Sequence, residues 1–147
     1  MTKEIYIGGN VASSKNSKRW TGKCLIGSKT TMAYKKNTAK EYASQANTFR
    51  TMLKGKTPPY RVEFTFIRDS KRRFDYCNAI QIVADMMVEY GWIEDDSADI
   101  FLPVFAPYQY KKNNGGVIIR VLESDGWEED DFEIGDIPKL KASDLFY

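Results

Sequence analysis

Carboxylates bracket one apolar segment in the middle of the chain. Asp75 precedes a largely apolar run that ends at Gly91, and Asp95 and Asp96 follow that run. Three cations, at residues 71–73, come directly before Asp75. Phosphodiester cleavage requires stabilisation of charge on the attacking and leaving oxygens, and Mg²⁺ ions held by two or three aspartates can supply it. The pattern fits this metal-dependent chemistry, and it also fits an ordinary helix with polar ends.

The segment between these carboxylates is expected to be a helix over about residues 78–90. Its polar residues recur at spacings of three and four, which places them along one face; they are Asp75, Asn78, Gln81, Asp85 and Glu89. This line is either the solvent side of the helix or part of a site. A 12-residue helix is roughly 18 Å long. Asp75 and Asp96 therefore meet only if the chain runs back along the helix after Gly91, or if a partner chain supplies one of them.

The composition restricts the chemistry that the 147-residue chain can perform. Histidine is absent, which excludes histidine-based triads and the usual zinc sites. Any bound metal should be a hard ion held by oxygen, Mg²⁺ with Mn²⁺ as a substitute, and no small-molecule cofactor is expected. Cys24 and Cys77 form neither a metal-finger spacing nor a disulfide framework, so we expect reduced thiols and a cytoplasmic location. No apolar run approaches the roughly 20 residues of a membrane span, and the N-terminus is too short and polar for a secretory signal.

Charge is distributed unevenly along the chain, although the formal net charge is only +2. Residues 1–122 carry 20 Lys and Arg against 11 Asp and Glu, a net charge of +9. Residues 123–147 carry nine acidic residues and two lysines, a net charge of −7. We therefore expect a folded domain over residues 1–122 and an acidic tail or docking arm over residues 123–147. The basic body indicates a polyanionic partner for which the tail can compete; the alternative is a solubilising tail on a mildly basic domain.

Hydrophobic periodicity predicts the order β-α-β-α-β-β. Strands are expected over residues 4–8, 60–66, 100–105 and 117–122, and a first helix over about residues 32–53. A polar loop is expected from residue 9 to about residue 29. Pro103 places its strand at an edge or a bulge, and residues 111–116 have the composition of a hairpin turn. These elements predict a small α+β sandwich, with two helices on one face of a mixed sheet.

The stretch RRFDYCNAIQIVADMMVEYGWIEDDSA, residues 72–98, resembles the core of the RusA family of Holliday-junction resolvases, which are of phage and prophage origin. That core has basic residues, Asp-x-Asp-Asn, a helix carrying Lys and then Asp, a Gly turn, and Asp-Asp. The matching residues here include Asp75, Asn78, Asp85 and Gly91, and no gap is needed between Asp75 and Asp96. A basic loop before the first helix is also similar, so the resemblance covers roughly residues 4–122.

The resemblance implies a Mg²⁺-dependent, structure-specific endodeoxyribonuclease. It would resolve Holliday junctions or other branched DNA in recombination and repair, as a homodimer. The implied catalytic and metal-binding residues are Asp75, Asp95 and Asp96, supported by Asn78, Gln81 and Asp85. The implied contacts to the DNA backbone are cations of the loop and of the run before Asp75: Lys15, Lys18, Arg19, Lys71, Arg72 and Arg73.

Two positions depart from the RusA pattern. Cys77 stands where the family has its second aspartate, and Gln81 stands where it has the helix lysine. A thiol is a soft ligand that suits Mg²⁺ poorly, and cysteine is also a common core residue. These departures leave open a catalytically weakened or inactive junction-binding protein of the same fold. A third alternative is a small interaction module whose acidic tail is the working part.

Overall fold

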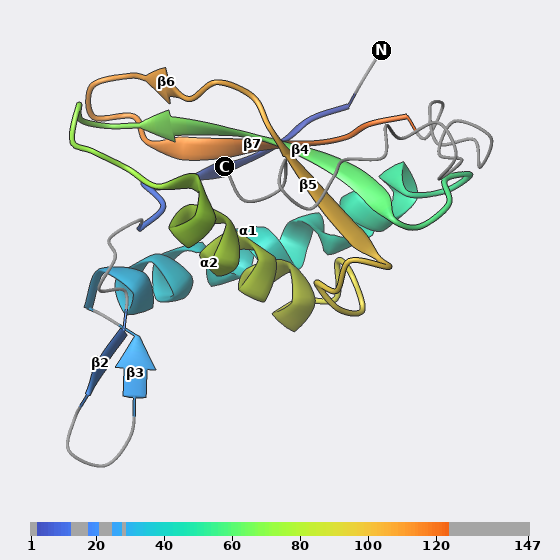
Figure 1. Ribbon diagram of the computed structural model, residues 1–147, viewed down its shortest axis with the longest axis horizontal. Coiled ribbons are helices and arrows are strands. Elements are labelled where there is room, and N and C mark those ends of the chain that lie inside the picture. The colour runs from blue at the N-terminus through green and yellow to red at the C-terminus, as the bar shows by residue number, and fades with distance from the viewer. Residues whose placement is uncertain (1–2, 13–17, 21–24, 28, 124–147) are drawn as a thin grey trace, which may run out of the picture.

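The computed structural model (Figure 1) describes residues 3–12, 18–20, 25–27 and 29–123, with the backbone alone for residues 18–20 and 25–27. Its elements are, in chain order, β1 (Ile5–Gly8), β2 (Lys18–Trp20), β3 (Leu25–Gly27), α1 (Lys29–Met52), β4 (Tyr60–Arg68), α2 (Tyr76–Glu89), β5 (Phe101–Phe105), β6 (Gln109–Tyr110) and β7 (Gly116–Val121). In this part of the chain, no helix is long and apolar enough to cross a membrane.

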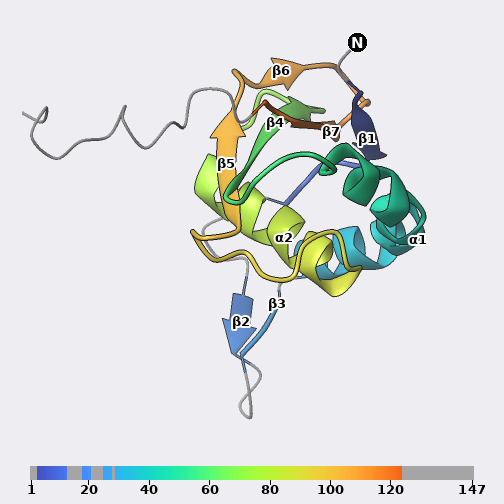
Figure 2. The ribbon, with the colours of Figure 1, turned by 90° about the vertical axis from the view of Figure 1, so that its right-hand side faces the viewer.

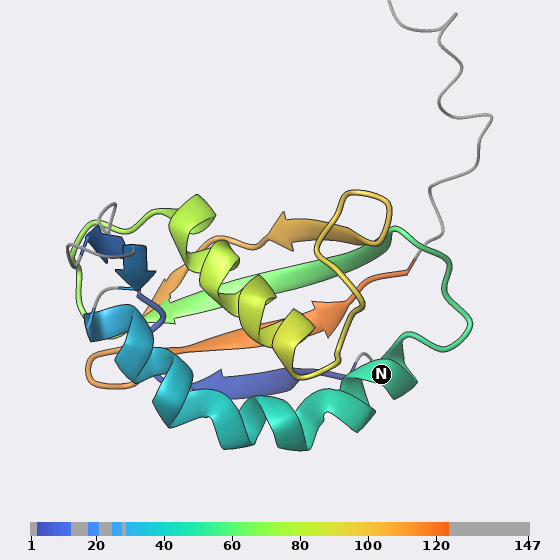
Figure 3. The same cartoon turned by 90° about the horizontal axis from the view of Figure 1, so that it is seen from below.

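A mixed sheet forms one layer, and the two helices form the other. The strand order is β1-β7-β4-β5, and β6 also pairs with β4. β4 runs antiparallel to β7 and parallel to β5. Both helices cover the same face of this sheet, as Figures 2 and 3 show from two directions. The predicted α+β sandwich is confirmed.

The alternation along β4 determines which side of the sheet is buried. Val62, Phe64 and Phe66 are fully buried, because alternate side chains of a strand point to the same face. The strand continues to Arg68, two residues beyond its expected end. β5 lies at the sheet edge, and its Pro103 is aligned with Val62 of β4. The edge position predicted from this proline is confirmed, since proline has no N–H to donate to a second neighbour.

Aromatic residues pack the chain that follows α2 against α1. The buried side chains of α1 recur at spacings of three and four; they are Thr31, Tyr34, Thr38, Tyr42, Ala46 and Phe49. Trp92 follows α2 and donates its Nε1–H to the carbonyl oxygen of Tyr42, over 2.7 Å. Its ring centroid lies 5.4 Å from that of Tyr42 and 4.9 Å from that of Phe49. This contact fixes the chain against α1 directly after it leaves α2.

The stretch expected as a polar loop contains a strand pair. β2 and β3 form a separate antiparallel sheet of two strands. Figures 1 and 3 place this pair at the end of the molecule where β4 ends and both helices begin. The loop prediction for residues 9–29 was therefore wrong for six of these residues, and the basic segment has a defined backbone direction there.

Candidate nucleic-acid interface

Asp75 lies between the end of β4 and the first residue of α2, and it caps that helix. Its φ and ψ of −122° and 119° are extended, and its Oδ1 accepts the backbone N–H of Cys77 over 2.8 Å. An aspartate at this position satisfies a backbone donor that the helix leaves unpaired. The negative charge also interacts favourably with the N-terminal end of the helix dipole. One oxygen of the predicted metal ligand is therefore already part of a helix cap.

The cations at residues 71–73 are exposed in the connection between β4 and α2. The ammonium group of Lys71 lies 5.3 Å from the ring centroid of Tyr110. Across the described part of the chain, no ion pair involves residues 71–73. We call residues 71–73, with the adjoining starts of α1 and α2, the basic end. Its uncompensated charges are available to a polyanion.

Arg72 and Arg73 line a pocket of about 540 Å³, which we call the arginine pocket. Its other lining residues come from the end of β4, the chain after β1, the start of α1 and the turn before β7: Asn10, Ala12, Thr30, Arg68, Asp69, Ser70 and Asn113. Asn113 has a φ of 64°, a left-handed conformation that asparagine tolerates in turns. The pocket thus collects segments that are distant in the sequence.

Arg68 is the buried cation of this pocket. Its Nη1 donates to the carbonyl oxygen of Val11 over 2.5 Å, and its guanidinium carbon lies 4.7 Å from the ring centroid of Phe74. Burial lowers the pKa of Arg68 from its ordinary value, while the Asp69 carboxylate opposes this shift. A guanidinium group nevertheless remains charged at neutral pH in proteins. Arg68 is not among the site residues predicted from the sequence. The one feature of the sequence that could have indicated it is its position at the end of the strand that begins at Tyr60.

The polar line on α2 faces solvent over most of its length. Gln81, Asp85 and Glu89 are exposed, and Asp75 and Asn78 are half-buried. Asp85 forms an ion pair with Lys35 of α1, with 3.4 Å between Nζ and Oδ2. Both side chains are substantially exposed, so this pair contributes at most about 1 kcal/mol. For this part of the line, the interpretation as the solvent side of an amphipathic helix is confirmed.

Cys77 is exposed at the first turn of α2. The alternative that Cys77 packs in the core is therefore wrong. The neighbouring Tyr76 is the packing residue: its ring centroid lies 4.8 Å from that of Phe74 and 5.0 Å from that of Phe105. Cys77 thus lies on the surface beside Asp75, and a polar side chain at this position would not disturb the core.

Asp95 and Asp96 lie at the opposite end of α2 from Asp75. Both are exposed in the loop before β5. β5 starts at Phe101, which is aligned with the first residue of β4, whereas Asp75 follows the last residue of β4. The 14 residues of α2 span roughly 21 Å. Figure 3 shows the helix running from the end of β4 back toward the end where β4 begins.

The predicted metal ligands lie apart from one another in the described part of the chain. No group of three or more Asp, Glu, Cys or His side chains able to hold a metal ion occurs among the described residues. The carboxylates of Asp75, Asp95 and Asp96 have the chemistry that Mg²⁺ prefers, but the length of α2 separates the first from the other two. Of the two arrangements left open by the sequence, a chain that runs back along the helix to Asp75 is not what the described residues form. A site completed by a partner chain stays a prediction.

Several predicted positions fall outside what the structure describes. Lys15 is not among the described residues, and Lys18 and Arg19 lie on β2, where the backbone alone is described. Their strand is nevertheless at the basic end (Figure 1). The proposed acidic tail is described only at Glu123, its first residue.

Comparison with known proteins adds no independent assignment. No protein-family model matches the chain, and no curated protein sequence matches it. The resemblance to the RusA family therefore rests on the residues quoted for it, chiefly those between Arg72 and Ala98.

Proposed function

We propose that this chain is a Mg²⁺-dependent endodeoxyribonuclease that acts on Holliday junctions or other branched DNA, and that the basic end holds the DNA. The observation that carries the proposal is the position of residues 71–73. They are exposed, they have no ion-pair partner in the described part of the chain, and they lie directly beside Asp75. Cations in this arrangement would contact phosphates without reading the base sequence.

The arginine pocket supports a backbone-binding role. Arg72 and Arg73 stand at its wall, and the buried Arg68 adds a third guanidinium. Guanidinium groups bind phosphate oxygens in pairs, through parallel N–H donors. A pocket of about 540 Å³ is open enough to admit a phosphate with its attached sugars. Recognition of backbone shape, rather than of bases, is what a branched-DNA enzyme needs.

The metal ligands require a second copy of the chain. In a twofold dimer with antiparallel α2 helices, the start of one helix lies beside the end of the other. Asp75 of one copy would then stand near Asp95 and Asp96 of its partner. The homodimer that the resemblance implies would thus bring these carboxylates of two copies close to each other, and Mg²⁺ would be held between the copies.

The deciding experiment measures binding and cleavage separately. Purified full-length protein is incubated with a labelled synthetic four-way junction, with Mg²⁺ or Mn²⁺ and with neither. Cleavage should require the metal, and Asp75→Asn should abolish cleavage while sparing or tightening DNA binding. Asparagine caps helices about as well as aspartate, so this variant retains the cap on Cys77 and keeps α2 intact. Cleavage by Asp75→Asn at the wild-type rate would contradict the assignment of this residue.

A second candidate is a junction-binding protein that has lost cleavage. Two observations favour it: Asp75 Oδ1 is engaged in the helix cap, and Cys77 is exposed at the position of the family's second aspartate. Under this alternative the protein binds the junction through the basic end and leaves it intact with either metal. The same experiment distinguishes the two candidates, since both predict binding and only one predicts cleavage.

A further inference from the structure

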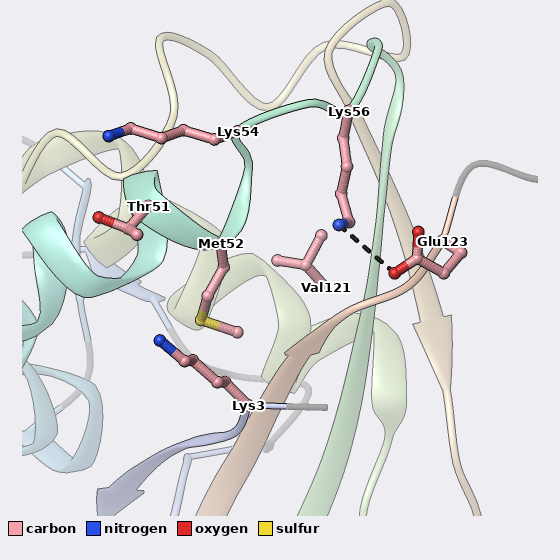
Figure 4. A pocket seen from close by; sticks show the side chains of 7 residues that line it. All are labelled: Lys3, Thr51, Met52, Lys54, Lys56, Val121 and Glu123. Carbon is pink, nitrogen blue, oxygen red and sulfur yellow. Dashed lines mark ion pairs between the residues drawn. The ribbon is translucent and has the colours of Figure 1, made fainter. Parts of the chain in front are cut away.

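A second cationic pocket lies at the opposite end of the molecule from the basic end. It has a volume of about 400 Å³ and is lined by three lysines, Lys3, Lys54 and Lys56, together with Thr51, Met52, Val121 and Glu123. We call it the lysine pocket. Figure 4 shows the three lysines on the segment before β1, the turn after α1 and the segment before β4, with Met52 and Val121 between them and the Lys56 side chain directed at Glu123.

The lysine pocket carries more positive charge than its own acid can neutralise. Lys56 pairs with Glu123, with 3.6 Å between Nζ and Oε1 (Figure 4). Lys3 and Lys54 are exposed, and neither forms an ion pair with any described residue. The lining of the pocket therefore holds three lysines and one carboxylate. The walls contributed by Met52 and Val121 are apolar.

An apolar pocket adjoins the lysine pocket. Its volume is about 540 Å³, and Lys54 lines both pockets. Aliphatic and aromatic side chains form most of its wall: Leu53, Pro58, Tyr60, Trp92, Ile93 and Ile100. A segment that combines acidic and aromatic residues would match the two pockets together. Lysines would bind its carboxylates, and the apolar wall would bind a ring.

The chain itself supplies such a segment at this place. Glu123 lines the lysine pocket and is the last described residue. Residues 124–147 contain eight acidic residues and two lysines; five of the acids fall within residues 125–131, and Trp127 and Phe132 are interspersed with them. An extended chain covers about 3.3–3.6 Å per residue, so residues 125–132 can reach every part of both pockets. A tether this short gives an effective concentration of about millimolar, so even weak docking would be populated.

We propose that residues 125–132 fold back onto their own chain and dock there, with carboxylates in the lysine pocket and Trp127 or Phe132 on the apolar wall. The acidic segment would then neutralise the end of the molecule that the proposed DNA-binding surface does not use. Nonspecific attraction of polyanions would be confined to the basic end. This inference does not depend on nuclease activity, because it concerns the opposite end of the molecule.

The test compares backbone amide resonances of the full-length chain with those of a variant whose tail is neutralised. That variant changes the five acids within residues 125–131 to their amides. Docking predicts shifts at residues 51–56 and 121–123, no shifts at residues 71–73, and independence of protein concentration. Unchanged resonances at residues 51–56 would overturn the proposal. So would shifts at the basic end, or shifts that grow with protein concentration, because the tail would then bind another surface or another copy.

Lysine variants give a second and independent readout. Lys3→Gln/Lys54→Gln removes the two unpaired cations of the pocket and retains the Lys56–Glu123 pair. Raising the salt concentration should move the resonances of residues 51–56 in the wild-type chain and should no longer move them in this variant. Lys36→Gln/Lys40→Gln, at exposed positions of α1, is the matched control and should keep the wild-type salt dependence. Equal salt dependence in all three proteins would overturn the proposal.

Discussion

Mixing two inactive variants should restore cleavage if the metal ligands come from two chains. The variants are Asp75→Asn and the double change Asp95→Asn/Asp96→Asn. Within one chain, these carboxylates are separated by the 14 residues of α2, or roughly 21 Å. Mg²⁺ binds oxygen at about 2.1 Å, so two of its ligand oxygens lie at most about 4 Å apart. A single chain cannot close that gap without dismantling α2.

The size of the restored activity follows from the geometry of a twofold dimer. Each shared site takes Asp75 from one chain and Asp95 and Asp96 from the other. In a mixed dimer, one site therefore contains all the substitutions, and the other site contains none. Random reassortment of equal amounts gives mixed dimers in half of the population. About one quarter of the wild-type number of intact sites is therefore expected. Because each mixed dimer has one intact site, it should nick one strand of a junction and fail to make the paired cut.

The assay follows strand nicking in a labelled four-way junction, with Mg²⁺ and saturating protein. The two variants are co-expressed with different tags, so that mixed dimers can be isolated and their fraction confirmed. Glu94→Gln serves as a control for the loss of an exposed charge in the same loop, and it should cleave normally. If isolated mixed dimers remain inactive while wild-type protein cleaves, the shared-site reasoning is refuted.

Three other expectations concern DNA binding and stability. Changing residues 71–73 to Gln should weaken junction binding and reduce the slope of log K against log salt by at most about 3; Lys40→Gln should not. Trp92→Phe removes the buried hydrogen bond to the Tyr42 carbonyl, and urea unfolding should show a loss of about 1–3 kcal/mol. Burial raises the pKa of both Tyr34 and Tyr42. The folded state then retains protons that the unfolded state loses above about pH 10, so stability should fall as pH rises further. Tyr34→Phe should reduce that dependence by about 1 kcal/mol per pH unit.

The periodic parts of the sequence predicted the main sheet and both helices well. In β4, the alternation of Val62, Phe64 and Phe66 determines a buried face, and these residues are buried as expected. Of the two positions that Pro103 indicated, an edge or a bulge, the structure shows the edge. The helix before Gly91 also ends as expected, since Gly91 adopts a left-handed φ of 76°. Strand alternation, an edge proline and a helix-ending glycine depend on residues that are close in the sequence, so the sequence alone can indicate them.

The features that the sequence did not reveal depend on tertiary contacts. The β2–β3 pair is formed by two strands of three residues each, which are too short for hydrophobic periodicity to register. Arg68 reads as an ordinary strand residue, but in the fold it donates to the carbonyl oxygen of Val11, far away in the sequence. A pattern of residue types cannot indicate such a partner. The arginine pocket was missed for the same reason.

The separation of the carboxylates follows from the topology. β4 and β5 are parallel neighbours, and a parallel pair requires a crossover that returns the chain to the starting end. α2 is that crossover. A residue before α2 and a residue after it must therefore lie at opposite ends of the sheet. The sequence left open whether the chain after Gly91 runs back along the helix to Asp75, and the crossover shows that within one chain Asp96 stays at the other end.

Introducing an acid at position 77 should promote metal binding beside Asp75. Cys77 is exposed in the first turn of α2, so an aspartate there would not disturb the core. A negative charge in this turn also stabilises a helix by about 0.3–1 kcal/mol. Cys77→Asp should therefore unfold at the same or a higher temperature, gain more from added Mg²⁺ in thermal unfolding than the wild type does, and cleave junctions at a lower Mg²⁺ concentration. Cys77→Asn is the uncharged control and should show none of the metal effects. If Cys77→Asp and Cys77→Asn respond equally to Mg²⁺, the start of α2 does not contribute to a metal site, and the binding-only alternative is favoured.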